Sequence, residues 1–238
     1  MSERLILLPG WGLGSGALDP LVTALRGLAE PVQVQTEALP EPGSIQLSDW
    51  LDALDERLPN DVWLGGWSLG GMLAAELAAR RGERCPGLLT LASNPCFVAR
   101  ADWPDAMPAE MFEAFLAACK ADPKTLLKRF ASLCAQGAAD PRGLSRRLAV
   151  AEPASTQTLA EGLHVLAELD TRAALQAFAG PQLHLFAGSD SLVPVGAVSA
   201  LRKLVPKAEI GVVERASHGF ILEDPDRVAG AIGAFVHE

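Results

Sequence analysis

A serine set between glycines, with an apolar run before it and a helix-forming run after it, constrains this chain more than any other feature. The segment is Gly66-Trp67-Ser68-Leu69-Gly70-Gly71, with Val62-Trp63-Leu64 before it and Met72 to Ala79 after it. This pattern predicts a sharp turn from a strand into a helix, where only glycines two residues either side of the serine leave room. We predict that Ser68 is a nucleophile. The alternative is a Gly-rich turn that contains serine by chance.

Six short apolar runs, most of them without alternation, are typical of parallel strands covered on both faces. They are Leu5 to Leu8, Val32 to Thr36, Val62 to Gly65, Leu88 to Ala92, Leu183 to Ala187 and Ile210 to Val213. Helical patterns separate them, at Leu18 to Leu28, Leu47 to Leu58, Met72 to Arg81, Val195 to Leu204 and Pro225 to Val236. The alternation predicts an α/β fold, with a mostly parallel sheet of about six strands flanked by helices.

A long stretch after Ala92 lacks a strand pattern but carries several helical ones, from about Met107 to Ala179. Long insertions in such folds belong at the carboxyl edge of the sheet, where ligands bind. We expect residues 98–179 to form a helical lid inserted in one core, made of residues 1–97 and 180–238. A chain of 238 residues that is 49% hydrophobic is long enough to bury such a core.

Overall charge and composition exclude several functions. A net charge of -9 argues against binding to nucleic acid or to an anionic membrane surface. No apolar stretch reaches membrane-spanning length, and the first residues do not have a signal-peptide pattern. The four cysteines lack metal-ligand spacing, so we expect no metal and free thiols, which suggest a cytoplasmic protein. They are Cys85, Cys96, Cys119 and Cys134. We also expect no cofactor and a monomer.

One region has the opposite charge. Seven basic and two acidic residues lie between Lys120 and Arg147, a local charge of +5. Asp122-Pro123 and Asp140-Pro141 each predict a helix start. The basic residues spaced by four, which share a helix face, are Lys124 with Lys128 and Arg142 with Arg146. A helix dipole opposes cations in the first turn by roughly 0.3 to 1 kcal/mol each, so a docking surface explains them better than helix stability does. A merely solvated face is the alternative.

The nucleophile needs a base, and the base needs a carboxylate that holds it in one tautomer. His218 is the best placed of the four histidines, because it follows the last predicted strand by a few residues. Asp190 follows the fifth predicted strand, at the sheet edge where Ser68 should emerge. The order Ser68, Asp190, His218 is that of α/β-hydrolases.

Acyl transfer also needs donors for the oxyanion. We expect them to be the backbone N–H groups of Leu69 and of Trp11, in the Gly-rich loop from Pro9 to Gly14. This loop is not a dinucleotide site, because it lacks the Gly-x-Gly-x-x-Gly pattern with a ribose-binding acid at the right distance.

Together, Leu8-Pro9-Gly10-Trp11-Gly12-Leu13, the Ser68 segment, Ala92-Ser93-Asn94-Pro95-Cys96-Phe97 and the basic helices form a recognisable combination. It resembles, over nearly the whole chain, the pimeloyl-[acyl-carrier protein] methyl ester esterases of biotin synthesis, within the α/β-hydrolase superfamily. The resemblance implies a serine carboxylesterase, without a cofactor, acting on the methyl ester of a pimeloyl chain borne on acyl-carrier protein. It also implies that lid bases dock the carrier and that a lid phenylalanine lies near the acyl chain. The matching positions are Lys124, Arg129, Arg142 and Arg146 for docking and Phe130 for the acyl chain.

Other interpretations stay open at this point. Phe130 and Trp11, which we expect to contact the substrate, could equally be packing residues of the core. The same catalytic residues would suit a general short-chain carboxylesterase or a thioesterase acting on small soluble substrates. A lidded receptor with vestigial hydrolysis is the non-enzymatic alternative.

Overall fold

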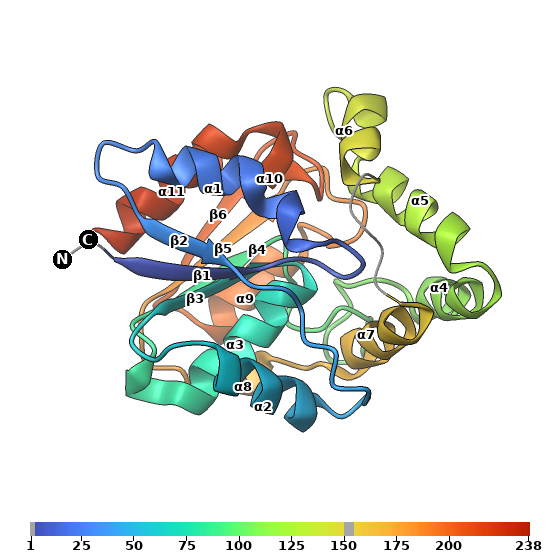
Figure 1. Cartoon of the computed structure of the whole chain (residues 1–238), viewed down its shortest axis with the longest axis horizontal. Coiled ribbons are helices and arrows are strands. Elements are labelled where there is room, and N and C mark those ends of the chain that lie inside the picture. Colours follow the sequence, from blue (N-terminus) through green and yellow to red (C-terminus); the bar gives the residue numbers. More distant parts are fainter. Residues whose placement is uncertain (1–2, 150–154) are drawn as a thin grey trace.

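The computed structural model describes residues 3–149 and 155–238. Within them, six strands form one sheet in the order β2-β1-β3-β4-β5-β6, and every neighbouring pair is parallel (Figure 1). The strands are β1 (Arg4–Leu8), β2 (Gln33–Thr36), β3 (Trp63–Trp67), β4 (Leu88–Leu91), β5 (Gln182–Ala187) and β6 (Glu209–Val213). The predicted α/β fold is confirmed, and each strand ends within two residues of its predicted limits.

Helices cover both faces of the sheet (Figure 1). On one face lie α1 (Asp19–Arg26), α10 (Phe220–Glu223) and α11 (Pro225–Val236); on the other lie α2 (Leu47–Arg57), α3 (Leu69–Arg81), α8 (Arg172–Ala177) and α9 (Ala197–Leu204). Short 3-10 turns are at Ser15–Leu18 and Gly82–Arg84. The five helices predicted around the sheet are confirmed. Helix α3 begins three residues earlier than predicted, because the turn at Ser68 leads straight into it.

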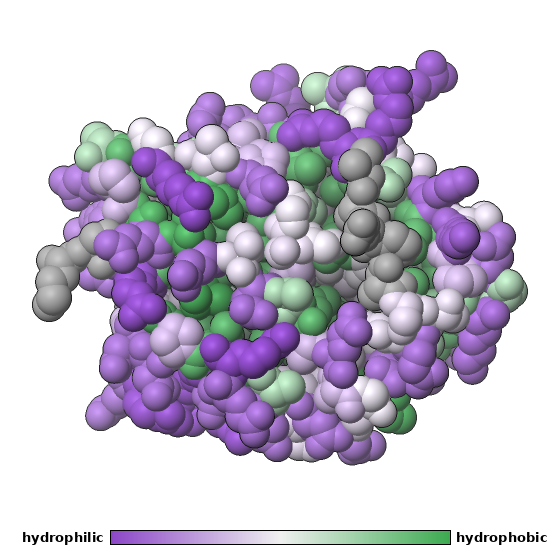
Figure 2. Space-filling view, viewed as in Figure 1, coloured by the Kyte–Doolittle hydropathy of each residue, from purple (hydrophilic) through white to green (hydrophobic). Residues whose placement is uncertain are grey.

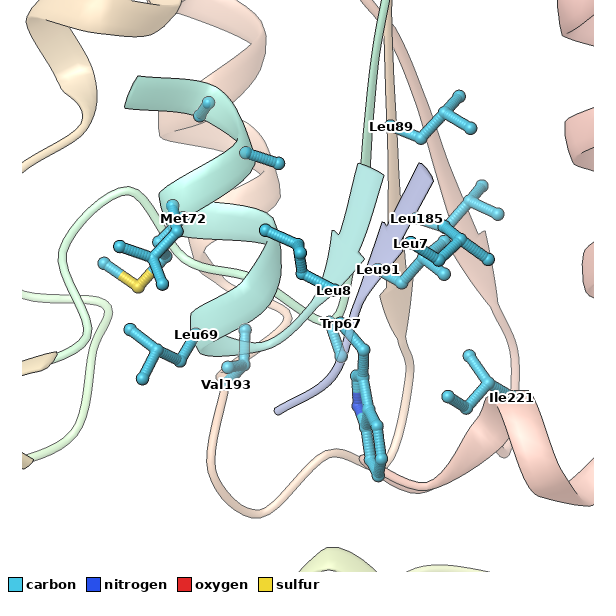
Figure 3. Close-up of a cluster of buried hydrophobic side chains, with 14 of the residues drawn as sticks. Leu7, Leu8, Trp67, Leu69, Met72, Leu89, Leu91, Leu185, Val193 and Ile221 are labelled. Carbon is cyan, nitrogen blue, oxygen red and sulfur yellow. The ribbon is translucent and has the colours of Figure 1, made fainter. Parts of the chain in front are cut away.

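Helix α3 is buried along nearly its whole length, since it packs between the sheet and the helices α2 and α8. Its small residues, Gly70, Gly71, Ala74 and Ala75, allow this close approach. At the carboxyl edge of the sheet, buried apolar side chains form one cluster that spans both faces, with Leu69, Met72 and Val193 on the side of α3 and Leu91, Leu185 and Ile221 on the other side (Figure 3). Trp67, Leu91 and Leu185 belong to that cluster and are fully or almost fully buried. Such burial contributes about 25 cal/mol per Å² of apolar surface, which holds this edge of the sheet firmly.

Among the described residues between β4 and α8, four helices are present: α4 (Ala109–Ala121), α5 (Pro123–Cys134), α6 (Pro141–Leu148) and α7 (Thr156–Glu168). These inserted helices stand beside the sheet, to the right in Figure 1. The predicted helix starts are confirmed: the Asp122 carboxylate accepts from the Thr125 N–H at 3.1 Å, and that of Asp140 from the Gly143 N–H at 2.9 Å. The division of the chain into a core and a lid at residues 98 and 179 stays a prediction.

Candidate active site

Ser68 lies in the turn between β3 and α3, with φ 56° and ψ -121°. Non-glycine residues rarely adopt such a conformation, and it is held only where the surroundings impose it. The neighbouring glycines are required sterically: a Cβ on Gly66 would lie 2.2 Å from the Gly70 carbonyl carbon, and one on Gly70 would lie 2.4 Å from the Leu8 oxygen. The turn predicted from the glycine spacing is therefore present.

Hydrogen bonds to the last residue of β4 and to Ser93 hold the backbone of Ser68 in place. Its N–H donates to the Leu91 carbonyl at 2.8 Å, and its carbonyl accepts from the Ser93 hydroxyl at 2.8 Å. Ser93 was not singled out from the sequence as a support for Ser68, because no local pattern links residues on two different strands. It lies there because β3 and β4 are neighbours in a parallel sheet.

Asp190 and His218 follow β5 and β6, at the same carboxyl edge as Ser68. The Nδ1 atom of His218 lies 2.8 Å from the Asp190 Oδ2 atom, and both side chains are fully buried. The other carboxylate oxygen accepts from the N–H groups of Leu192 and Val193 at 2.8 and 2.9 Å. A carboxylate bound to Nδ1 leaves Nε2 as the basic nitrogen. That Nε2 atom is buried and has no hydrogen-bond partner among the described residues.

A second set of contacts holds the backbone on both sides of His218. Glu223 accepts from the N–H of Ser217 at 2.8 Å and from its hydroxyl group. The Trp67 indole N–H donates to the His218 carbonyl at 3.0 Å, which ties the base to the strand that carries Ser68. Neither Ser217 nor Glu223 stood out in the sequence, although both lie within five residues of His218.

The Gly-rich loop after β1 passes directly beside Ser68, because a Cβ on Gly10 would lie 3.4 Å from the Ser68 Cβ. Trp11 follows in this loop, and Leu69 opens α3, where the first amides have no partner within the helix. The Trp11 indole N–H donates to the Leu159 carbonyl of α7 at 2.8 Å. Of the two predicted oxyanion residues, Leu69 directly follows Ser68, and Trp11 directly follows Gly10, which lies beside Ser68.

Phe130 on α5 packs edge-to-face on Trp11, with ring centroids 5.0 Å apart, and more loosely on Phe115 at 6.4 Å. All three side chains are buried. A cavity of about 280 Å³ lies beside the same loop, lined among others by Trp11, Trp50 and Leu159. Phe130 therefore packs in an aromatic cluster at the boundary between the loop and the inserted helices, which is compatible with both roles considered for it.

The basic residues of α5 and α6 are exposed, and hydrophilic side chains project from this part of the surface (Figure 2). They are Lys124, Lys128 and Arg129 on α5 and Arg142, Arg146 and Arg147 on α6. Arg129 lies over the Phe115 ring at 5.8 Å, and Arg147 donates to the Leu222 carbonyl at 3.0 Å. No acidic residue in the described part of the chain pairs with any of the six.

His184 and the four cysteines are buried in the interior of the protein. Burial lowers the pKa of His184 to about 4, and its ring lies 2.6 Å from the Thr90 hydroxyl inside the sheet. All four cysteines are free and buried. Within residues 3–149 and 155–238, no cluster of side chains has the make-up of a metal site, and no helix has the length and apolarity to cross a membrane.

Residues 5–231 match the family model described as the alpha/beta hydrolase family. Two solved structures share the fold: a bromoperoxidase from Bacillus anthracis and an esterase from Exiguobacterium antarcticum. Each is 18% identical to this chain with a TM-score of 0.82, and the match covers 100% of this chain and 93% and 92% of theirs, respectively. At this identity, the likeness shows the fold alone.

Curated relatives are more similar in sequence. The pimeloyl-[acyl-carrier protein] methyl ester esterase of Aromatoleum aromaticum is 35% identical over 94% of each chain. That of Aeromonas hydrophila is 34% identical over 98% of this chain and 94% of its own. A biotin biosynthesis bifunctional protein of Cellvibrio japonicus is 38% identical over 97% of this chain, which spans about half (47%) of that protein. The chain therefore belongs to the alpha/beta hydrolase family and, within it, to the pimeloyl-[acyl-carrier protein] methyl ester esterases.

Proposed function

We propose that this chain is a serine carboxylesterase that hydrolyses the methyl ester of pimeloyl-acyl-carrier protein, giving pimeloyl-acyl-carrier protein and methanol in biotin biosynthesis. The full-length relatives carry this activity in their names and match nearly the whole chain. The single observation that carries the chemistry is the buried pair of Asp190 and His218, set at the same sheet edge as the strained turn of Ser68.

In the first half of the reaction, the Ser68 hydroxyl oxygen attacks the ester carbonyl carbon while its proton passes to Nε2 of His218. Asp190 holds the imidazole in the required tautomer and stabilises the imidazolium that forms. The backbone N–H groups of Trp11 and Leu69 bind the oxyanion, and each such donor typically lowers the barrier by about 2.7 to 4 kcal/mol. The C–O bond to the methoxy group then breaks, and the departing oxygen takes the proton from His218 as methanol.

In the second half, a water molecule attacks the acyl-enzyme carbonyl and gives its proton to His218. The same oxyanion donors stabilise the second tetrahedral intermediate. Its collapse releases the free carboxylic acid and returns the proton to Ser68. No group outside the chain and water is needed to balance these steps.

The exposed bases of α5 and α6 give the carrier protein a place to dock. Acyl-carrier proteins are acidic, and a basic surface with no acidic partner among the described residues is complementary to them. We assign docking to Lys124, Arg129, Arg142 and Arg146, and acyl-chain contact to Phe130 and Trp11. The inserted helices act as the lid in this scheme. The four buried free thiols suit a reducing cytoplasm, where we propose that the chain acts as a monomer.

The decisive experiment compares two substrates with the same pimeloyl methyl ester, one borne on acyl-carrier protein and one on a small thiol such as N-acetylcysteamine. A kcat/KM at least tenfold higher for the carrier-borne ester, falling toward that of the small ester as salt is raised, is expected from electrostatic docking. Equal kcat/KM values would indicate a general esterase. Absence of hydrolysis of either, with no labelling of Ser68 by a fluorophosphonate, would indicate a ligand-binding protein.

A further inference from the structure

Two loops carry the acid and the base of the site. The acid loop comprises residues 188–193, after β5, and the base loop comprises residues 214–219, after β6. The turn between α5 and α6 lies against the acid loop, and residues of the two helices themselves lie against the base loop. We call the segment from α5 to α6, residues 123–148, the basic hairpin, because it also carries the exposed cations described above.

The first contact joins the basic hairpin to the acid loop. Gly137 has φ +94°, and a Cβ at this position would lie 2.4 Å from the Ser189 carbonyl oxygen and 2.8 Å from the Ser189 Cβ. Real Cβ atoms do not approach a backbone oxygen so closely, so a side chain at residue 137 would push the hairpin and the acid loop apart. Ser189 directly precedes Asp190, so the displacement would reach the carboxylate.

The second contact joins the basic hairpin to the base loop. The N–H of Gly219, the residue after His218, donates to the Cys134 carbonyl at the end of α5, at 3.0 Å. A Cβ on Gly219 would lie 2.9 Å from the Leu144 Cδ2 atom on α6. Both helices of the hairpin therefore touch the residue that adjoins the base.

Two further observations agree with this placement. The Arg147 guanidinium group, on α6, donates to the Leu222 carbonyl of α10 at 3.0 Å, just beyond the base loop. The Cys134 thiol is fully buried, and burial followed by the nearby charge of Asp190 raises its pKa well above the usual value. The end of α5 thus lies close to the acid as well as to the base.

We propose that the basic hairpin positions the acid–base pair. Gly137 is a positioning residue for Asp190, and the Cys134 carbonyl and the Leu144 side chain hold Gly219, the residue next to His218, in place. The proposal rests on the catalytic roles given to Asp190 and His218 above. It adds that the basic hairpin, which carries the surface proposed for carrier docking, packs directly against the loop that carries the catalytic base.

The main test is Gly137→Ala, with Gly82→Ala as its matched control. Gly82 also has a left-handed backbone (φ +55°), but no atom of the described residues lies within 4 Å of the Cβ that alanine would add there. Both variants carry the backbone strain, and Gly137→Ala alone carries the clash. We expect kcat for a small soluble ester to fall at least about tenfold in Gly137→Ala with KM changed less than twofold, and to be unchanged in Gly82→Ala.

A spectroscopic measurement separates positioning from a general loss of structure. The proton between His218 Nδ1 and Asp190 should give a low-field proton NMR signal, and that signal should shift or broaden in Gly137→Ala. The thermal unfolding midpoints of Gly137→Ala and Gly82→Ala should meanwhile both exceed the assay temperature. A normal signal together with a kcat within twofold of the parent would overturn the proposal.

A rescue pair covers the case in which Gly137→Ala does not fold. Gly219 has φ -83°, which alanine adopts freely, so Gly219→Ala acts mainly through its contact with Leu144. We expect Gly219→Ala to lower kcat and the double variant Gly219→Ala/Leu144→Ala to recover it to within about threefold of Leu144→Ala alone. A double variant as impaired as Gly219→Ala would exclude the hairpin as the cause.

The substrate distinguishes failure of this proposal from failure of the proposed function. Loss of kcat on the small ester in Gly137→Ala supports positioning, even where the parent protein shows no preference for carrier-borne ester. A carrier preference in a parent protein whose Gly137→Ala variant keeps full kcat would support the proposed function and contradict the positioning role.

Discussion

The sheet and the inserted helices contribute to the site in different ways. The sheet presents Ser68, Asp190 and His218 from the ends of three parallel strands, with backbone hydrogen bonds and buried apolar packing below them. The inserted helices contribute aromatic and glycine contacts above, on Trp11 and on the acid and base loops, and expose six cations to solvent. In the scheme that we propose, the reacting groups belong to the sheet, whereas their final alignment and the choice of partner depend on the insertion.

The largest effect should come from Ser68→Ala, which removes the nucleophile from the sheet side of this comparison. We expect turnover of any ester to fall by at least about 10⁴-fold, because binding and the oxyanion donors alone leave only residual catalysis. The measurement is steady-state hydrolysis, together with loss of fluorophosphonate labelling and an unchanged circular dichroism spectrum. Near-normal hydrolysis would place the chemistry elsewhere.

Asp190→Asn should follow closely, with a loss on the order of 10³ to 10⁴ in kcat. The amide keeps the shape of the side chain, but its oxygen is needed to accept from the Leu192 and Val193 N–H groups, so its NH₂ group faces Nδ1 of His218 and donates to it. The ring proton then sits on Nε2, which can no longer accept the proton of Ser68. Labelling of Ser68 by a fluorophosphonate should slow in parallel. A loss of only a few-fold would mean that another carboxylate serves His218.

On the side of the inserted helices, Gly162→Ala should reduce kcat by about 10- to 100-fold, since a shift of roughly 1 Å in the site can have this effect. A Cβ on Gly162 of α7 would lie 2.9 Å from the Trp11 Cδ1 atom, so it would move the residue whose N–H we assign to the oxyanion. Gly230→Ala, in α11, is the matched control, because the part of the chain that the structure describes places no atom within 4 Å of the new Cβ. Equal kcat values in both variants would show that catalysis does not depend on the close packing of Trp11 against α7.

Reversing two cations, Arg142→Glu with Arg146→Glu, should raise KM for the carrier-borne ester about tenfold or more and leave the small ester unchanged. The effect should fade at high salt, because screening shortens the reach of exposed charges. Lys203→Glu with Lys207→Glu makes the same change of charge at exposed positions outside the inserted helices. If both double variants raise KM alike, net charge matters and the hairpin surface does not.

The smallest effect concerns Glu76 on α3, whose ionisation is influenced by Asp170, a residue between α7 and α8. Burial, and then the charge of Asp170, raise the pKa of Glu76 from 4.5 to about 7. The folded state therefore holds this proton more tightly than the unfolded state, and this group's contribution to stability is lost as pH rises from about 4.5 to 7. Glu76→Gln should raise the unfolding midpoint at pH 8 relative to the parent, by no more than about 2–4 °C, and should change it little at pH 4. Glu113→Gln, at an exposed position of α4, should show no such pH-dependent difference.

The sequence predicts features that depend on local pattern. The glycines around Ser68 specify the turn, apolar runs specify the strands, and Asp-Pro pairs mark the starts of α5 and α6. Because parallel strands end at one edge, the loops after β5 and β6 could be named as sources of the acid and the base before the fold was known.

Contacts between distant segments could not be predicted in this way. Ser93 beneath Ser68, Gly137 against Ser189 and Gly162 against Trp11 each join residues that are 25 or more positions apart. The sequence around Ser93, Gly137 and Gly162 does not indicate these contacts. A glycine that allows a close approach cannot be distinguished from other glycines by its neighbours in the sequence. The two roles considered for Phe130 stay open for the same reason, since packing and substrate contact require the same apolar ring.

The end of α11 lies at the opposite side of the molecule from the basic hairpin (Figure 1). It is held there by the edge-to-face packing of Phe235 on Trp63 and by the contact of the His237 ring with the Glu30 carbonyl. A fluorophore, a bead or a second catalytic module attached through a short tether at this end would therefore leave the cationic surface clear. The geometry makes the end of α11 a suitable attachment point for immobilising the enzyme while the carrier protein that we propose as its partner flows past it.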